Sequence, residues 1–152
     1  MRAYVGLGGN LGDREATLRE AVRRLDAEPG IEVVSVSSFV ETEPWGYADQ
    51  AWFLNGACAV ETELSPRDLL ARLLAVERQL GRTRGDGPRF GPRTVDLDLL
   101  VYGDLVVDEP GLQVPHSRLA ERRFALAPLS EIAPDLVVPG HGPVADLLAG
   151  VE

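Results

Sequence analysis

The sequence predicts an α+β fold: a βαββαβ core with an antiparallel sheet and helices on one face, followed by a C-terminal hairpin and further helices. Two observations predict it. Four runs of apolar and β-branched residues have the length of strands, and two segments between them carry apolar residues at the helical period. This order is typical of the ferredoxin-like arrangement, which leaves the opposite face of the sheet open for a ligand.

The first half of the core is expected to contain a strand, a helix and two more strands. The first strand covers residues 3–7. Asp13 suits the N-cap of the helix, because its carboxylate can accept a backbone N–H of the first turn. The apolar residues of this helix follow the helical period, and they are Leu18, Ala21, Val22 and Leu25. Pro29 and Gly30 end it, and we expect strands at 31–40 and 52–62 with a loop at 41–50.

The second half begins with Ser65 and Pro66, a capping residue followed by a proline at the first helical position. The buried stripe of this helix is Leu69, Leu73, Val76 and Leu80, and Gly81 stops it. The last core strand is expected at 94–101. Beyond it the pattern indicates a hairpin at 101–105, a helix at 117–126 and a short helix at 143–148.

Length and charge restrict the class of protein. A chain of 152 residues fits one domain, residues 1–152, with a substantial core. Its formal net charge of −9 repels nucleic acid and anionic membranes at long range, and no apolar run reaches membrane-spanning length. We therefore expect a soluble, cytoplasmic monomer that acts on small molecules.

Several residue types exclude particular chemistries. All fifteen basic residues are arginine, so the chain has neither the lysine of a Walker A loop nor the strand lysine of a protein kinase. The glycine-rich turn at 6–12 misses the spacing of a dinucleotide-binding turn. Cys58, the only cysteine, lies in an apolar run and is predicted to be a small core residue without chemistry.

Two aspartates in the last core strand predict a metal site. Alternation along the strand sends Val95, Leu97 and Leu99 to one face, so Asp96 and Asp98 share the other. They are separated by about 6.6 Å along the strand, and their carboxylates can lean onto two metal ions roughly 3.5–4 Å apart. Magnesium takes one or two carboxylates and completes its shell with water and phosphate oxygens, so a triphosphate would complete this site.

An arginine-rich segment directly precedes this strand. Its four arginines lie within twelve residues, and they are Arg82, Arg84, Arg89 and Arg93. The guanidinium group donates two parallel hydrogen bonds to phosphate oxygens and keeps its charge near neutral pH. Because the chain as a whole is acidic, this local positive cluster beside two aspartates indicates a magnesium–polyphosphate site.

Five motifs in this order resemble one enzyme family. They are the turn Gly8-Gly-Asn-Leu-Gly12, Phe53-Leu-Asn55, Gly91-Pro-Arg-Thr-Val-Asp-Leu-Asp98, Val114-Pro-His116 and Arg122-Arg-Phe-Ala-Leu-Ala-Pro-Leu129. Together they resemble the 6-hydroxymethyl-7,8-dihydropterin pyrophosphokinases of folate biosynthesis over nearly the whole chain. The resemblance implies transfer of a pyrophosphoryl group from ATP to the hydroxymethyl group of the reduced pterin, giving the pterin diphosphate and AMP.

The resemblance also implies roles for individual residues. Asp96 and Asp98 would hold two magnesium ions. The phosphate contacts would come from Arg82, Arg84, Arg93, His116 and Arg122, with Arg82 and Arg93 catalytic. Glu77, Phe90 and Leu99 would line the nucleotide pocket. For the pterin, alternation places Phe53 and Asn55 on one face of their strand, and the resemblance adds Phe124 and the backbone near Thr42 and Trp45.

Some positions depart from the family pattern, and other functions remain open. Ser117 stands where a tyrosine is common, Ala120 where a lysine is frequent, and Phe90 where a tryptophan is frequent. The alternatives are a different metal-dependent nucleotidyltransferase, which would release pyrophosphate, and a noncatalytic ferredoxin-like module that binds a metabolite. An RNA-binding domain is disfavoured by the acidic charge and the missing aromatic RNP pattern.

Overall fold

The computed structural model describes residues 1–9, 13–42, 53–81 and 95–151. The elements of the sheet and its helices are β1 (Arg2–Gly9), α1 (Arg14–Ala27), β2 (Ile31–Val36), β3 (Val40–Thr42), β4 (Phe53–Thr62), α2 (Pro66–Gln79) and β5 (Asp96–Tyr102). The C-terminal part contains β6 (Val107–Glu109), β7 (Leu112–Val114), a 3₁₀ turn (Leu119–Glu121), α3 (Arg123–Ile132), β8 (Val137–Val138), β9 (Gly142–Pro143) and α4 (Val144–Gly150). None of the described helices is both long and apolar enough to cross a membrane.

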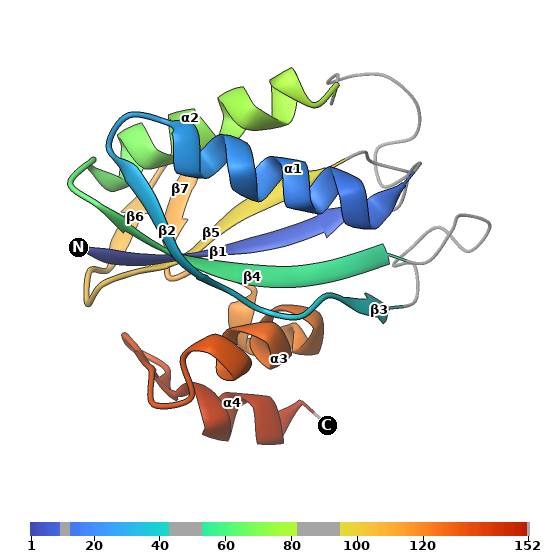
Figure 1. Ribbon diagram of the computed structural model, residues 1–152. Coiled ribbons are helices and arrows are strands. Elements are labelled where there is room, and N and C mark those ends of the chain that lie inside the picture. The colour runs from blue at the N-terminus through green and yellow to red at the C-terminus, as the bar shows by residue number, and fades with distance from the viewer. Residues whose placement is uncertain (10–12, 43–52, 82–94, 152) are drawn as a thin grey trace.

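The central sheet is antiparallel and has the strand order β2-β4-β1-β5, with β3 also paired to β4. Helices α1 and α2 cover one face of it, and α3 and α4 lie on the opposite side (Figure 1). The expectation that all core helices share one face is confirmed for α1 and α2. The expectation that the opposite face is open is wrong in part, because α3 packs against β4 there.

The face toward α1 and α2 forms the larger core. Leu18 and Leu25 of α1 and Leu69 and Leu73 of α2 are fully buried against the sheet, as their periodicity predicts. Both predicted caps are present. Asp13 Oδ1 accepts the N–H of Ala16 at 3.1 Å, and Ser65 Oγ accepts the N–H of Asp68 at 3.1 Å. Local sequence signals are therefore enough to specify these two helices.

The face toward α3 has a smaller core, which includes Leu126 and Leu129 of α3 and Leu100 and Val101 of β5. The predicted helix at 117–126 is wrong. The backbone leaves helical geometry at Arg122, and α3 begins at Arg123 and continues through Pro128 to Ile132. Proline removes one helical hydrogen bond. Burial of the apolar residues on both sides of Pro128 outweighs that loss.

Two other boundaries differ from the prediction. The strand expected at 31–40 is interrupted after Val36, where the Ser37 hydroxyl accepts the N–H of Ala57 at 2.8 Å and takes the place of a backbone ladder bond. The hairpin expected at 101–105 is only a turn, and the true hairpin pairs β6 with β7. Its turn contains Gly111, which has a φ of +76° that favours glycine.

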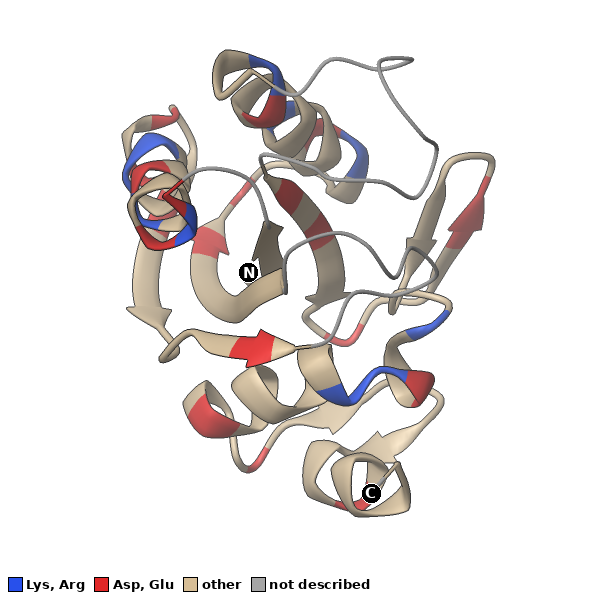
Figure 2. Ribbon diagram, turned by 90° about the vertical axis from the view of Figure 1, so that its right-hand side faces the viewer, with Lys and Arg blue, Asp and Glu red and all other residues tan. Residues whose placement is uncertain are grey.

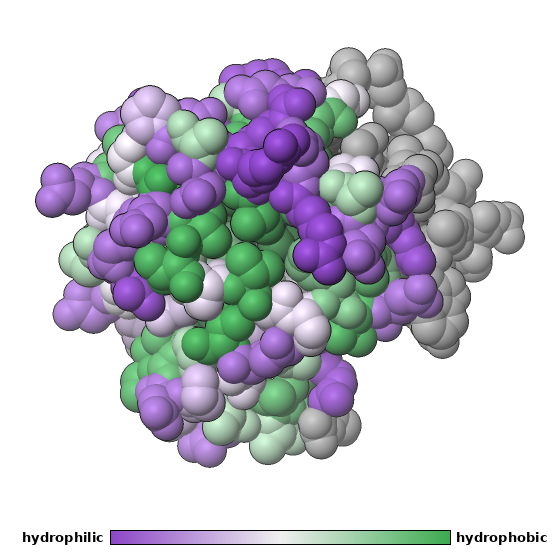
Figure 3. All heavy atoms as spheres, in the orientation of Figure 1, coloured by the Kyte–Doolittle hydropathy of each residue, from purple (hydrophilic) through white to green (hydrophobic). Residues whose placement is uncertain are grey.

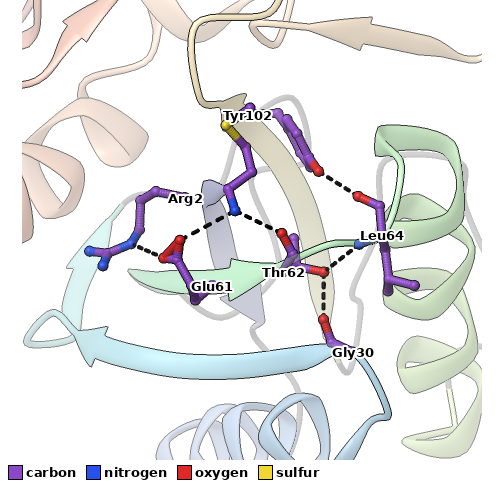
Figure 4. A network of polar contacts seen from close by, with 7 residues as sticks. Arg2, Gly30, Glu61, Thr62, Leu64 and Tyr102 are labelled. Atoms are coloured by element: carbon purple, nitrogen blue, oxygen red, sulfur yellow. Dashed lines mark hydrogen bonds and ion pairs between the residues drawn. The ribbon is translucent and has the colours of Figure 1, made fainter.

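Polar contacts fasten the end of the sheet where β1 begins (Figure 4). Arg2 Nε donates to Glu61 Oε2 at 2.9 Å, and the Thr62 hydroxyl donates to the carbonyl of Gly30 at 2.5 Å. The Tyr102 hydroxyl donates to the carbonyl of Leu64. The opposite end of β1, at Gly8, is about 20 Å away along the strand. These contacts therefore stabilise the sheet without occupying its other end.

The surface reflects this layered arrangement. In Figure 3, hydrophilic side chains gather over α1 and α2, and apolar ones over the middle of the face, where β2 and the chain after it pass. The exposed apolar residues of this region include Val34, Val36 and Val40. Cys58 lies in β4 and is buried, and burial raises the pKa of its thiol to about 12. Its prediction as a core residue is confirmed.

Candidate functional site

The two aspartates of β5 lie on the face of the sheet turned toward α3. Asp96 pairs with Gly8 and Asp98 pairs with Gly6 across the β1–β5 ladder, and paired residues share a face. Leu97 pairs with Leu7, and both are buried in the core on the other face. The predicted alternation is confirmed. Figure 2 views the sheet from this end and shows two acidic bands on β5, with basic positions before α3 across from them.

The glycines opposite the aspartates keep this part of the sheet bare. A Cβ atom at Gly8 would come within 3.0 Å of Asn55 Oδ1, and one at Gly6 within 3.4 Å of the Leu100 side chain. The row Val40, Asn55, Gly8, Asp96 crosses four adjacent strands on the same face. Gly8 in this row, and Gly6 opposite Asp98, leave room for a ligand between the asparagine and the aspartates.

A cavity of about 650 Å³, which we call cavity A, lies between this face and the segment that leads into α3. It brings together eight of the residues that the sequence singled out, and they are Thr42, Phe53, Asn55, Asp96, Asp98, His116, Arg122 and Phe124. The Arg122 guanidinium lies 5.4 Å from the centre of the Phe124 ring. Cavity A therefore combines the aromatic rings of Phe53 and Phe124, the amide of Asn55, the carboxylates of Asp96 and Asp98 and cationic groups.

A second cavity of about 600 Å³, cavity B, lies between α2, β5 and the β6–β7 hairpin. Leu70 and Leu99 line it, together with the hairpin residues from Asp108 to Gln113. Asp98 and His116 line both cavities. A ligand that extends from one cavity to the other would thus pass these two side chains.

Asn55 is buried and has a defined orientation. Its Nδ2 donates to the Thr42 hydroxyl, so its Oδ1 is turned toward the space above Gly8. Thr42 pairs with Phe53 across β3 and β4, so the three residues form one corner of cavity A. The alternation that predicts Phe53 and Asn55 on one face is confirmed.

His116 is held in a neutral form that can donate from Nε2. Its Nδ1 accepts the backbone N–H of Arg118 at 3.1 Å, which leaves the ring proton on Nε2. Burial lowers the pKa of His116, and the nearby charges of Arg122 and Arg118 lower it further, against an opposite influence from Asp96. At neutral pH the imidazole is therefore a hydrogen-bond donor without a positive charge.

Glu77 of α2 is buried behind β5 rather than along either cavity. Its Oε2 accepts the N–H of Leu97 at 2.7 Å, which is the residue between the two aspartates. This hydrogen bond from a buried side chain holds the strand at the position that presents both aspartates. Its expected place beside the nucleotide stays a prediction.

Six of the predicted site residues lie outside the described residues, and they are Trp45, Arg82, Arg84, Arg89, Phe90 and Arg93. Sequence reasoning missed Arg118, Glu121 and Arg123, which also line cavity A. A signal for them was present, because Arg118, Arg122 and Arg123 form a second arginine cluster just after His116. No sequence pattern singles out Glu121, the acidic residue of the same segment.

The donor set at the aspartates fits a hard cation. Within the described ranges, no group of three or more His, Cys, Asp or Glu side chains is arranged to hold a metal ion. Asp96 and Asp98 alone, both partly exposed in cavity A, match the one or two carboxylates by which magnesium is usually bound, with phosphate and water filling the other positions.

Known proteins resemble this chain over most of its length. The family model described as 7,8-dihydro-6-hydroxymethylpterin-pyrophosphokinase (HPPK) matches residues 4–134. A 2-amino-4-hydroxy-6-hydroxymethyldihydropteridine pyrophosphokinase of Methylorubrum extorquens is 51% identical over 140 residues, which cover 92% of this chain and 87% of that protein. The enzyme of the same name from Bacillus subtilis is 49% identical over 130 residues, covering 86% of this chain and 77% of the relative.

A solved structure supports the fold independently. The Plasmodium falciparum HPPK-DHPS A437G/K540E structure, with pterin and p-hydroxybenzoate, superposes with a TM-score of 0.76 at 13% identity. The superposition covers 98% of this chain and 43% of that longer chain. At this identity the likeness shows a shared fold only.

Proposed function

Because the chain belongs to the 7,8-dihydro-6-hydroxymethylpterin-pyrophosphokinase family, it transfers a pyrophosphoryl group from ATP to hydroxymethyl-dihydropterin, and we propose that cavities A and B carry out that reaction. One observation carries the proposal. Asp96 and Asp98 share a face whose floor is glycine, and Asp98 lies where the two cavities meet. The proposed arrangement has the pterin in cavity A, the nucleotide base toward cavity B and the phosphates between them.

The aspartates would bind two magnesium ions. When bound, such ions would neutralise phosphate charge and make the attacked phosphorus more electrophilic. Asp96 and Asp98 supply the oxygen ligands, and the buried contact of Glu77 with Leu97 keeps their strand in place. The bare floor at Gly6 and Gly8 leaves the carboxylates open to a bulky anion.

Cationic groups and His116 would hold the phosphate chain. The Nε2–H of His116 can donate to a phosphate oxygen, and Arg122 provides charge on the other wall of cavity A. From the same resemblance we propose that Arg82, Arg84 and Arg93 also contact the phosphates, with Arg82 and Arg93 catalytic. These groups stabilise the charge on the equatorial and leaving oxygens without themselves reacting.

The pterin would lie between Phe53 and Phe124, with its amide-like edge toward Asn55. Two aromatic rings offer stacking. The Asn55 amide already donates to Thr42, so its Oδ1 is the part that can accept a hydrogen bond from a pterin N–H. The backbone near Thr42 and Trp45 is proposed to complete this subsite.

Leu99, Glu77 and Phe90 are proposed to serve the nucleotide. Leu99 lines cavity B beside Leu70, which offers an apolar surface for a base. We further propose a ferredoxin-like description of the β1-α1-β2-β4-α2-β5 core, which its strand order supports. A single domain, a monomeric state and a cytoplasmic location complete the proposal.

The test is a product analysis. Incubation with ATP, magnesium and 6-hydroxymethyl-7,8-dihydropterin, followed by nucleotide chromatography, should yield AMP only when the pterin is present. Omission of magnesium should abolish the reaction, and calcium in its place tests the demand for a small cation. ADP as product would contradict pyrophosphoryl transfer, and free pyrophosphate would favour a nucleotidyltransferase. Unchanged ligand affinity in Asp96→Ala together with no turnover of the wild type would favour a binding module.

A further inference from the structure

The segment from Ser38 to Thr42 is held from both sides of the sheet. Toward α1, the Phe39 ring lies 5.6 Å from the Arg19 guanidinium, and Glu41 Oε1 accepts from Arg14 Nη2 at 2.7 Å. Toward α3, Val40 and Thr42 line cavity A. The alternation of a strand thus puts residues 39 and 41 on the α1 side and residues 38, 40 and 42 on the α3 side.

Glu131 of α3 forms two hydrogen bonds with Ser38, the first residue of this segment. Its Oε2 accepts the backbone N–H of Ser38 at 2.8 Å, and its Oε1 accepts the Ser38 hydroxyl at 2.6 Å. Both oxygens of the carboxylate are used, and each bond is charge-assisted. These two hydrogen bonds lower the pKa of Glu131.

The position of Glu131 is unusual for an acidic residue. It is the penultimate residue of α3, where the partial negative charge of the helix terminus disfavours a carboxylate. No property of α3 by itself favours an acid there. The contact with Ser38 compensates for this cost, which indicates that the carboxylate acts in tertiary structure.

The contact between Glu131 and Ser38 lies next to cavity A, just outside the residues that line it. On the strand side, Val40 and Thr42 follow Ser38 by two and four residues and line the cavity. On the helix side, Ala127 and Phe124 precede Glu131 by four and seven residues, and they also line it. Glu131 and Ser38 therefore join the two walls of cavity A at its end.

We propose that Glu131 is a positioning residue for the pterin, which fixes the separation of the α3 wall from the β3 wall by holding Ser38. The inference rests on the proposed function, which assigns cavity A to the pterin. Neither Glu131 nor Ser38 lines the cavity, so they act through Phe124 on one side and Thr42 on the other. Their loss should loosen the subsite for the pterin and leave the phosphate chemistry at β5 intact.

The test compares steady-state constants of four variants with the wild type. Glu131→Gln and Ser38→Ala should each raise the KM for the pterin about three- to tenfold, the range expected for loss of one or two charge-assisted hydrogen bonds near the surface. The value of kcat and the KM for ATP should stay within about twofold, because no group at β5 changes. Ser38→Thr retains a hydroxyl and should restore the wild-type KM. Asp146→Asn on α4 removes the same charge from an exposed site and should have no effect.

A double variant and a direct binding measurement exclude a purely structural effect. Ser38→Ala combined with Glu131→Gln should raise the KM by less than the product of the two single increases, since both changes weaken the same contact. Pterin titration of tryptophan fluorescence, with a nonhydrolysable ATP analogue and magnesium present, should show the same ratios. A lower melting temperature with an unchanged pterin KM, or equal increases for both substrates, would overturn the proposal. Failure of the wild type to form AMP would instead reject the proposed function. The titration would still report on the effect of the Glu131–Ser38 contact on pterin binding.

Discussion

The two faces of the central sheet are made by alternate residues of the same strands, yet one face is closed and the other is partly open. On the α1–α2 side, β1 and β5 contribute Leu7 and Leu97 to a continuous core. On the α3 side, the neighbouring positions are Gly8 and Asp96, and a cavity remains between the sheet and α3. A one-residue step thus separates the residues that stabilise the fold from those proposed to perform the reaction. The two sets should respond oppositely to substitution.

The largest expected effect is on the open face. Asp98→Asn removes a charge where the phosphates are proposed to pass, and kcat should fall about a thousandfold, as for loss of a major electrostatic contact. The melting temperature should stay the same or rise, because Asp98 is only partly buried and lies beside Asp96, a like charge. Calorimetry and AMP formation measure the two quantities. A stability loss as large as that of a core variant would contradict the division between the faces.

The closed face should show the reverse behaviour. Leu73→Ala truncates a fully buried side chain between α2 and the sheet and should lower the unfolding free energy by about 2–5 kcal/mol. Below the melting temperature, kcat and both KM values should match the wild type, since Leu73 lines neither cavity. Urea denaturation followed by assays at low temperature tests this. A large kcat defect in the folded variant would show that the two faces are coupled.

A smaller effect is expected at the glycine floor. In Gly8→Ala the new methyl group would meet Asn55 Oδ1 at 3.0 Å, so the amide must move away from its proposed ligand position. The KM for the pterin should rise about tenfold, which corresponds to about 1.4 kcal/mol of binding free energy. Gly6→Ala is the matched control, because its methyl group would meet only the flexible Leu100 side chain at 3.4 Å. Equal effects of the two changes would argue against the orientation of Asn55 as the cause.

The smallest expected effect is the pH dependence of the stability that the Glu131–Ser38 contact contributes. Because the pKa of Glu131 is lowered by Ser38, the ionised form is favoured in the folded state. Its contribution to stability is present above about pH 4.5 and is lost as pH falls through the lowered pKa. The wild type should therefore be more stable than Glu131→Gln at pH 7, and the difference should shrink as the pH falls below 4.5. A difference that does not change with pH would show that charge is not the cause.

The closed face was more predictable from sequence than the open one. Asp13 and Ser65 mark the starts of α1 and α2 through local hydrogen bonds, and the apolar period gives their buried sides. The common face of Asp96 and Asp98 follows from strand alternation alone. These features depend on residues a few positions apart, so short-range rules are sufficient for them.

The open face depends on contacts that no short-range rule contains. Glu131 and Ser38 are separated by 93 positions. The continuation of α3 through Pro128 depends on burial of its apolar residues, which outweighs the hydrogen bond lost at the proline. The 3₁₀ turn and the break at Arg122, which bring Arg118 and Arg123 to cavity A, have no periodic signal. Prediction from sequence succeeded where the hydrogen bonds are local and failed where packing between distant segments decides.

The state of Cys58 makes the chain convenient for site-specific labelling. A thiol with a pKa of about 12 is almost entirely protonated at neutral pH, and its burial in β4 keeps maleimide reagents away. A reporter cysteine placed on an exposed position of α3 would thus be the one reactive thiol, without removal of the native residue. A fluorophore on that thiol would report on changes around α3 as substrates bind.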